Sequence, residues 1–438
     1  MTSFLFRCLF SLSLFGLSYS AYAQQLSLDK FIQTILENNP GVQKILVNNE
    51  VAAGELEASQ GINDAILSSS LTLVHSEPNE IIGFEASKSD DTQLKVSYDR
   101  LFSSSGRRLS LALSDQHTNR DPALTVGSQY YQPSFTLRLT QPLLKNTGGI
   151  QDRLNIDLKQ LNLKLTKLNN KESLESYITQ LALLYIDWYL ALRELDISKE
   201  VHQQSIQQEK LTRTKVRRQV VEPYELLRAQ ETREDYYSRW QQAKGRYAGL
   251  TRKIQYQMNL DNGSTSSQQL APDDPKSAKL LTSKQGEIRH PDYLSTTSRL
   301  KDILDTLKTQ QNIILDARRN AQDPDLNLSV GYTRHGISDN FNNAHTSDLD
   351  RDDYSVMLEY KYPLGNRQAK GNYQTQIANK KQVEADVKQR LIDAQANLSN
   401  LQEQASQLFI ALESTDRKIN YATRKLIKEK QLFKIGEL

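Results

Sequence analysis

The chain has 438 residues, of which 38% are hydrophobic, with a mean hydropathy of −0.61 and a formal net charge of +3 at pH 7. The near-neutral charge gives no electrostatic basis for nucleic-acid binding, and the low hydropathy suits thin helical walls better than one large globular core. The only cysteine, Cys8, lies in the expected signal sequence, which excludes disulfides and a thiol nucleophile from the mature chain.

Residues 1–23 are typical of a secretory signal. Arg7 provides a positive charge, Cys8 to Leu17 forms a short apolar core, and Ala21 to Ala23 is a small-x-small cleavage site. We therefore predict export, with cleavage between Ala23 and Gln24. After this segment the sequence contains no apolar run of 18 or more residues, so no transmembrane helix is predicted in the mature chain.

The rest of the chain is interpreted as two tandem structural repeats, over 24–262 and 287–438, joined by a Ser-, Pro- and Asp-rich linker over 263–286. Each repeat is predicted to contain a helix, an alternating stretch, and a strand that ends at a proline before a very long helix. The strand-to-helix junctions are Pro142 and Pro363, because proline cannot continue a strand ladder yet is tolerated at a helix start.

Apolar and polar residues alternate in several segments, which predicts strands with one apolar and one polar face. The apolar members are Leu71, Leu73, Leu94, Val96, Tyr98, Leu109, Leu111, Leu113, Phe135, Leu137, Leu139, Leu326, Leu328, Val330, Tyr332, Val356, Leu358, Tyr360 and Tyr362. Tyrosines at several strand ends suit the aromatic girdle of a membrane barrel. An ordinary half-buried antiparallel sheet is the alternative interpretation.

Heptad spacing predicts the long helices. In the first repeat it runs from near Ile150 to near Arg218, a length on the order of 100 Å at about 1.5 Å per residue. Pro223 is typical of a first-turn proline, so a return helix to about Leu260 is predicted. In the second repeat a heptad seam runs from Leu391 to Phe433. A homodimeric rod or a solvent-bridging hairpin is the alternative for such a pattern.

No catalytic, cofactor-binding or metal-ligating residue is predicted. The six histidines are scattered, and no phosphate-binding loop or nucleophile elbow occurs. Asp348, Asp350, Asp352 and Glu359 match calcium-loop positions, but Asp353 stands where glycine is needed, so they are interpreted as an acidic surface loop. A basic run just before the first turn is either a solvated face or a docking surface; it consists of Arg213, Lys215, Arg217 and Arg218.

Four short motifs, in order and partly duplicated, resemble those of the TolC-like outer-membrane efflux proteins. They are Leu26 to Phe31 with the following Asn39-Pro40, Leu137 to Leu144, Val356 to Gly365, and Phe433 to Glu437. The resemblance implies an α+β membrane protein, in which a homotrimeric outer-membrane β-barrel is continued by a long periplasmic α-helical barrel. It also implies four strands per chain and three further partners: a periplasmic adaptor protein, an inner-membrane pump and outer-membrane lipid.

By the same resemblance, the helical tips dock the adaptor. The residues assigned to this role are Arg217, Arg218, Val221, Glu222, Pro223, Lys434 and Gly436.

The chain departs from the family pattern in two places. An extra alternating pair around Ser103 to Gly106 is expected to extend an extracellular hairpin. The second repeat ends at Leu438, near the turn that corresponds to Pro223, so its return helix is absent from the sequence. We interpret this as a truncated copy or an incomplete record.

The predicted function is a passive exit duct of a tripartite efflux or type I secretion system, without cofactors. The alternative is a non-conducting periplasmic coiled-coil adaptor or envelope scaffold. An enzyme is not predicted, because no polar residues converge in a catalytic arrangement.

Overall fold

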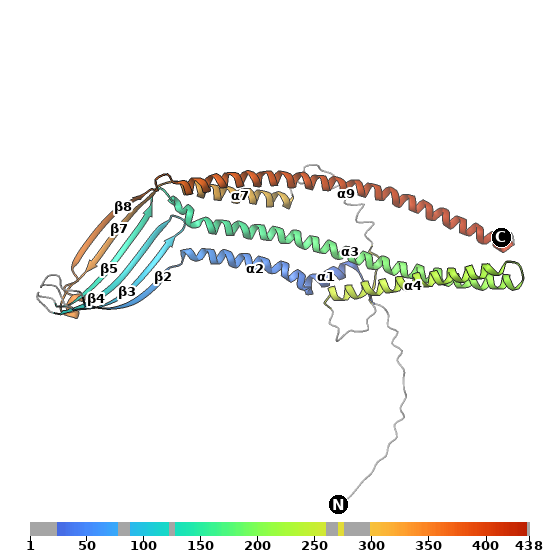
Figure 1. Cartoon of the computed structure of the whole chain (residues 1–438), viewed down its shortest axis with the longest axis horizontal. Helices are drawn as coiled ribbons and strands as arrows, with labels where there is room; N and C mark the ends of the chain where they lie inside the picture. Colours follow the sequence, from blue (N-terminus) through green and yellow to red (C-terminus); the bar gives the residue numbers. More distant parts are fainter. Residues whose placement is uncertain (1–23, 78–87, 122–127, 260–269, 276–297, 436–438) are drawn as a thin grey trace, which may run out of the picture. The chain divides into compact units, whose positions relative to one another are not determined.

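The computed structural model describes residues 24–77, 88–121, 128–259, 270–275 and 298–435 (Figure 1). The predicted signal with Ala23, and the tip residue Gly436, lie outside the described residues. The chain divides into two compact units, one formed by residues 1–48 and 170–288 and the other by residues 49–169 and 289–438. The described part of the first unit therefore comes from the first predicted repeat and the linker, whereas the second unit takes segments from both predicted repeats.

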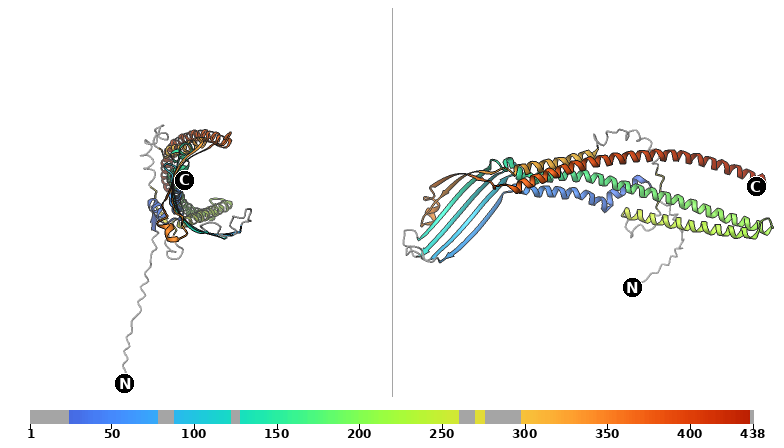
Figure 2. Two further views of the ribbon diagram at one scale, coloured as in Figure 1. Left: turned by 90° about the vertical axis from the view of Figure 1, so that its left-hand side faces the viewer. Right: turned by 45° about the horizontal axis from the view of Figure 1, so that its top comes forward.

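The second unit contains a six-stranded sheet, seen as a single layer in Figures 1 and 2. The strands, in spatial order, are β2 (Ile66–Ser76), β3 (Lys88–Phe102), β4 (Arg107–Asp121), β5 (Gln129–Pro142), β7 (Asp325–His335) and β8 (Arg351–Lys361). Every neighbouring pair is antiparallel. The predicted alternating residues fall in these strands, except Tyr362, which directly follows β8. Side chains of a strand point to opposite faces in turn.

Two expectations about the sheet are wrong. The resemblance implied four strands per chain, whereas β3 and β4 are full members of the sheet and make six. The turn at Ser103 to Gly106 was expected at the extracellular end, but it lies at the end where the helices begin. Its Ser103 N–H donates to Asn63 Oδ1 at 2.9 Å, just after the preceding helix. Alternation indicates how many strands occur, but not at which end a turn lies.

Four helices adjoin this sheet. Helix α2 (Pro40–Gln60) leads through the short helix η1 (Gly61–Asn63) into β2, and α3 (Ile150–Arg217) follows β5 through η2 (Thr147–Gly149). Helix α7 (Arg299–Asn320) precedes β7 and packs along α9 (Arg367–Ile435), which follows β8. A short helix α8 (Phe341–His345) lies between β7 and β8.

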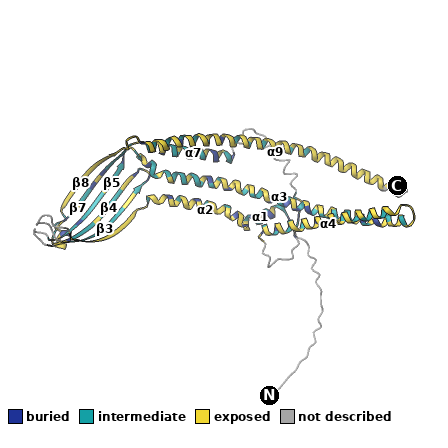
Figure 3. Cartoon of the chain, viewed as in Figure 1, coloured by how far each residue is buried: buried dark blue, intermediate teal, exposed yellow. Residues whose placement is uncertain are grey.

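The long helices agree with the heptad prediction, at 68 residues for α3 and 69 for α9. The C-terminal half of α9 is mainly exposed (Figure 3), including Leu401, Leu408 and Leu412 of its apolar seam. None of the described helices combines the length and apolarity needed to cross a membrane.

The first unit is a helical hairpin with a small apolar core. Helix α1 (Leu28–Asn38), the later part of α3, and α4 (Pro223–Gln257) pack beside a parallel pair of short strands, β1 (Gln24–Leu26) and β6 (Leu270–Pro272). Strand β6 lies in the predicted linker. The first-turn proline and return helix predicted at Pro223 are both present, with α4 ending three residues before the expected Leu260.

The core of this unit is built around aromatic side chains. Tyr185 and Trp188 of α3 are fully buried, and their ring centroids lie 5.8 Å apart in an edge-to-face arrangement. The ring centroid of Phe31 of α1 lies 5.8 Å from that of Tyr185. The Tyr185 hydroxyl lies 2.6 Å from the carbonyl oxygen of Leu26 and accepts from the N–H of Asp273 at 3.0 Å. The aromatic core thus anchors both short strands on α3.

Candidate functional site

One face of the six-stranded sheet is apolar on every strand. Directly opposed residues of antiparallel strands share a face, and one such row joins Leu67, Tyr98, Leu111, Leu137, Tyr332 and Tyr354. Many of these side chains are exposed, for example Leu71 at 64% and Val356 at 74%. Tyr332 lies 6.5 Å from Phe135 and 5.4 Å from Tyr354 between ring centroids, which forms an aromatic band. An exposed apolar surface of this extent marks contact with lipid or protein.

The opposite face is polar, and its side chains form hydrogen bonds from strand to strand. The bonded pairs are Ser68 with Ser97 at 2.8 Å, Asp99 with Ser110 at 2.6 Å, Ser114 with Ser134 at 2.7 Å, Thr136 with Thr333 at 3.1 Å, and Thr140 with Ser329 at 2.9 Å. Such short hydroxyl and carboxylate side chains suit contact with water. The sheet is therefore amphipathic across its whole width, as the wall of an aqueous membrane pore must be.

The junction between sheet and helices is held by asparagine side chains. Pro142 is the last residue of β5, and Pro363 lies between the end of β8 and the start of α9. After Pro142, Asn146 adopts a left-handed backbone, and its Oδ1 accepts from the N–H of Gln151 at 2.9 Å. After Pro363, Asn366 is also left-handed and donates to the carbonyl oxygen of Gln322 at 2.9 Å.

Neither asparagine was predicted from the sequence. Asn146 follows Pro142 and Asn366 follows Pro363 by a few residues, and both lie near glycine. This signal for a left-handed backbone was present in the sequence.

The turn between α3 and α4 is a compact, mainly exposed tip. Helix α3 ends in a Schellman motif, with Gln219 left-handed, its N–H bonded to Val216 O at 2.9 Å and the N–H of Val220 bonded to Lys215 O at 2.9 Å. Glu222 then occupies the N-cap position of α4 without a side-chain capping bond, and Pro223 lies in its first turn. The loop between the two helices is therefore short, and its left-handed position is occupied by Gln219 and not by glycine.

The predicted docking residues that the structure describes belong to two different units. Arg217, Arg218, Glu222 and Pro223 are exposed at this tip, and Val221 is half-buried. Exposed apolar side chains lie beside them, namely Val220, Tyr224 and Leu227. Lys434 lies in the last turn of α9, in the other unit. The tip therefore offers apolar groups bordered by arginines.

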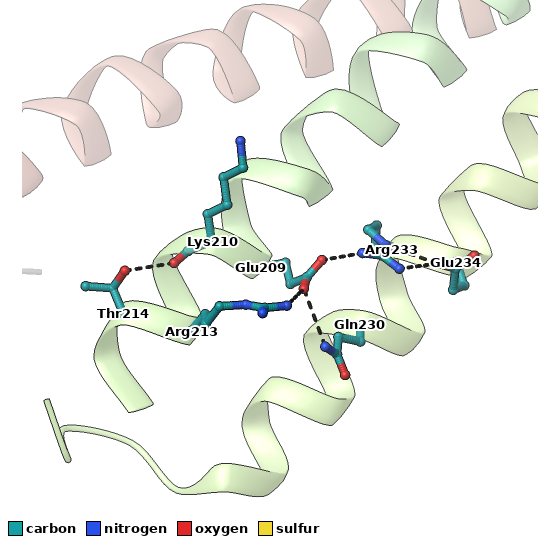
Figure 4. Close-up of polar contacts among 7 residues, drawn as sticks. All are labelled: Glu209, Lys210, Arg213, Thr214, Gln230, Arg233 and Glu234. Carbon is teal, nitrogen blue, oxygen red and sulfur yellow. Dashed lines mark hydrogen bonds and ion pairs between the residues drawn. The ribbon is translucent and has the colours of Figure 1, made fainter. Parts of the chain in front are cut away.

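A buried carboxylate joins α3 to α4 near the tip (Figure 4). Glu209 is 5% exposed and accepts from Arg213 at 2.5 Å, from Arg233 at 2.7 Å and from Gln230 at 3.5 Å. The hydrogen bond from Arg213 lowers the pKa of Glu209 below its ordinary value, with burial opposing and Gln230 and Arg233 assisting. Glu209 was not predicted from the sequence, because its partners Arg233 and Gln230 lie in a different helix.

The acidic residues that matched calcium-loop positions are not gathered into a loop. Asp352 and Glu359 belong to β8, where Asp352 accepts from the Tyr332 hydroxyl at 2.7 Å. No group of three or more His, Cys, Asp or Glu in the described part of the chain could hold a metal ion. The histidines that the structure describes lie in separate elements, whereas His290 lies outside the described residues.

No protein-family model matches the chain, and no curated protein matches it in sequence. Solved structures do match over nearly its whole length. The outer-membrane protein VceC from Vibrio cholerae is 10% identical with a TM-score of 0.64, over 93% of this chain and 86% of VceC. CusC, described as forming a transmembrane channel, is 13% identical with a TM-score of 0.61, over 94% of this chain and 83% of CusC.

The outer-membrane channel CmeC from Campylobacter jejuni is 15% identical with a TM-score of 0.57, over 94% of this chain and 77% of CmeC. The chain therefore has the fold of these outer-membrane channels, and the predicted class of a β-sheet part joined to long helices is confirmed. The trimer and the tandem repeat stay predictions.

Proposed function

We propose that the protein is an outer-membrane exit duct, whose sheet contributes to a membrane barrel and whose helices extend into the periplasm. The observation that carries this proposal is the sheet with one apolar and one polar face, joined to helices of 68 and 69 residues. Fold likeness to outer-membrane channels supports it. The apolar face contacts lipid and the polar face lines water.

The duct works as a homotrimer and performs no covalent chemistry. An inner-membrane pump supplies the energy and the substrate, and a periplasmic adaptor passes the substrate on, as in tripartite efflux or type I secretion. The adaptor docks at the α3–α4 tip, where the basic side chains Arg217 and Arg218 border apolar ones. Adaptor binding opens the tip by rearranging the helices.

Conductance of the detergent-extracted protein in planar lipid bilayers tests the duct. We expect discrete current steps and recovery of the protein in the outer-membrane fraction of cells. A protein that is recovered from the soluble periplasm and gives no steps is a coiled-coil scaffold instead, and the proposal fails.

Charge reversal tests the docking tip separately. Arg217→Glu with Arg218→Glu is expected to abolish efflux or secretion in cells while the amount of protein in the outer membrane is unchanged. Lys199→Glu, at an exposed position of the same helix α3 farther from the tip, is the matched control and should retain transport. Equal transport by the two variants would contradict the assignment of this tip as the docking site.

A further inference from the structure

The six-stranded sheet has two open edges. Strand β2 pairs only with β3, and β8 pairs only with β7, among the residues that the structure describes. Both edge strands have 11 residues, and all of their residues are exposed. A row of unpaired N–H and C=O groups is costly in lipid, at several kcal/mol for each group. The membrane location proposed above therefore requires that both edges be covered.

The two edges are complementary to each other. Strand β2 runs away from the helical end of the sheet, since α2 precedes it, and β8 runs back toward that end, since α9 follows it. Side by side they are antiparallel, like every other neighbouring pair in the sheet. A second copy of the same chain thus supplies the missing partner for each edge.

We propose that β8 of one copy pairs with β2 of the next with Leu71 opposite Val356, and that three copies close an eighteen-strand barrel. This rests on the proposed outer-membrane duct and its trimer. The register gives full overlap of the two strands and aligns their helical ends, with Ile66 opposite Lys361. It also continues the apolar face, since Leu67 meets Tyr360 and Leu73 meets Tyr354.

A shift of one residue destroys this match. Because side chains alternate between faces, Leu71 would then lie opposite Ser355 or Met357, which belong to the polar face. The same register places His75 opposite Asp352 at the far end of the strands, where opposite charges can meet. The same register thus matches the faces of the two strands, overlaps their full lengths and brings His75 opposite Asp352.

The register also gives a plausible barrel. The row of opposed residues that starts at Leu67 reaches Tyr354 after crossing six strands, and the proposed pairing continues it to Leu73 of the next copy. That is an advance of about six residues for six strands. At about 3.3 Å per residue and about 4.8 Å between strands, the strands tilt by roughly 35°, within the range of membrane barrels.

The width of the sheet matches that of the helices. Six strands with this tilt contribute roughly 35 Å of circumference per copy, and the four helices α2, α3, α7 and α9 at about 10 Å each contribute roughly 40 Å. Four strands would contribute only about 23 Å. The extra β3–β4 pair therefore brings the barrel close to the width of the helical wall, with a backbone diameter of roughly 35 Å for three copies.

Disulfide crosslinking in membranes tests the edge pairing. In a Cys8→Ser background, Ser70→Cys with Met357→Cys places both thiols on the polar face at opposed positions of the proposed register. We expect oxidation to give a product of three times the chain mass that resists heating in detergent and returns to the monomer on reduction. Ser70→Cys with Asp353→Cys, offset by four residues, should remain monomeric.

Thr136→Cys with Thr333→Cys is the internal control, because these hydroxyls lie 3.1 Å apart across β5 and β7 of one chain. Its intrachain disulfide shows that the sheet is folded and that oxidation works. The inference is overturned if this control disulfide forms while Ser70→Cys with Met357→Cys gives no interchain product, or gives a product of only twice the chain mass. A crosslink of the offset pair alone would overturn it as well.

Conductance separates this failure from failure of the duct. Wild-type protein that conducts but whose edge cysteines do not crosslink contradicts the eighteen-strand barrel and leaves the duct intact. Wild-type protein that never conducts contradicts the duct and the barrel together.

Discussion

At the scale of single residues, polar groups that are buried between helices hold the first unit together. Glu209 and Tyr185 both lie in α3, and both join that helix to segments distant in sequence. Buried polar groups are costly when they lose their partners, so each gives a measurable contribution to stability. Their ionisation also gives opposite dependences on pH.

Replacing Glu209 with glutamine should loosen the α3–α4 hairpin. The neutral amide has one acceptor oxygen and no charge for the two arginines, so we expect the free energy of opening to fall by about 1 to 2 kcal/mol at pH 7. Because the folded pKa of Glu209 is below its usual value, the wild-type contribution is present above the unfolded pKa of about 4.3. It is lost as pH falls through the folded pKa.

Amide hydrogen exchange of residues 205–235 between pH 3 and 7 measures this. The variant should lose the acid-dependent part of protection. Glu234→Gln is the matched control, since Glu234 pairs with Arg233 but its side chain is 61% exposed. If both variants lose the same amount of protection, Glu209 stabilises the hairpin no more than the exposed Glu234 does.

Tyr185→Phe should weaken the attachment of β1 and β6 to α3. It removes the hydroxyl that contacts Leu26 and Asp273, at an expected cost of about 1 to 3 kcal/mol. Burial raises the pKa of Tyr185 to about 12, so its contribution is present below the unfolded pKa of about 10 and is lost between about pH 10 and 12. Thermal unfolding from pH 8 to 12 checks this, with exposed Tyr421→Phe as the control. A curve identical to wild type would contradict it.

At the scale of elements, the close approach of the β3–β4 turn to the start of α3 is tested by two adjacent glycines. Gly148 and Gly149 both have positive φ, at 64° and 66°, so alanine strains either one by about 1 to 2 kcal/mol. A Cβ on Gly149 would collide with the backbone of Ser103, whereas a Cβ on Gly148 meets open space. Gly149→Ala should therefore lower thermal stability more than Gly148→Ala, by about 1 to 3 kcal/mol.

Scanning calorimetry or heat-dependent migration of the detergent-purified protein gives the comparison. If the two alanine variants unfold together, the turn does not pack against the helix start.

The two faces of β8 give a second test at this scale. Val356→Arg puts a charge on the apolar face, at an expected cost of about 2 to 4 kcal/mol near the bilayer centre, and should deplete the protein from the outer membrane. Ser355→Arg, one residue away on the polar face, should be tolerated. Quantitative immunoblotting of outer-membrane fractions distinguishes them, and equal depletion would contradict the assignment of faces.

Much of the element structure could be predicted from the sequence, because periodicity is a local property. Heptad spacing from near Ile150 predicted a helix to near Arg218, and the helix ends at Arg217. The location of the Ser103 turn, by contrast, depends on its contact with Asn63, 40 residues away. The pairing of Glu209 with Arg233 likewise follows from how two helices meet, which periodicity does not specify.

At the scale of the whole molecule, the proposed duct requires that the sheet lie in the outer membrane with its polar face toward water and its apolar face toward lipid. The fold supports this, since it is shared with outer-membrane channels over most of their length. The neighbouring residues Ser355 and Val356 of β8 and Ser70 and Leu71 of β2 are all exposed, and the two members of each pair lie on opposite faces.

The most direct test is thiol labelling of single-cysteine variants at these four positions in isolated outer membranes, with a membrane-impermeant maleimide. The proposed orientation of the sheet predicts rapid labelling of Ser355→Cys and Ser70→Cys, and protection of Val356→Cys and Leu71→Cys that is lost when the protein is unfolded in denaturant. Equal labelling of all four variants, or protection of the serine positions instead, would contradict it.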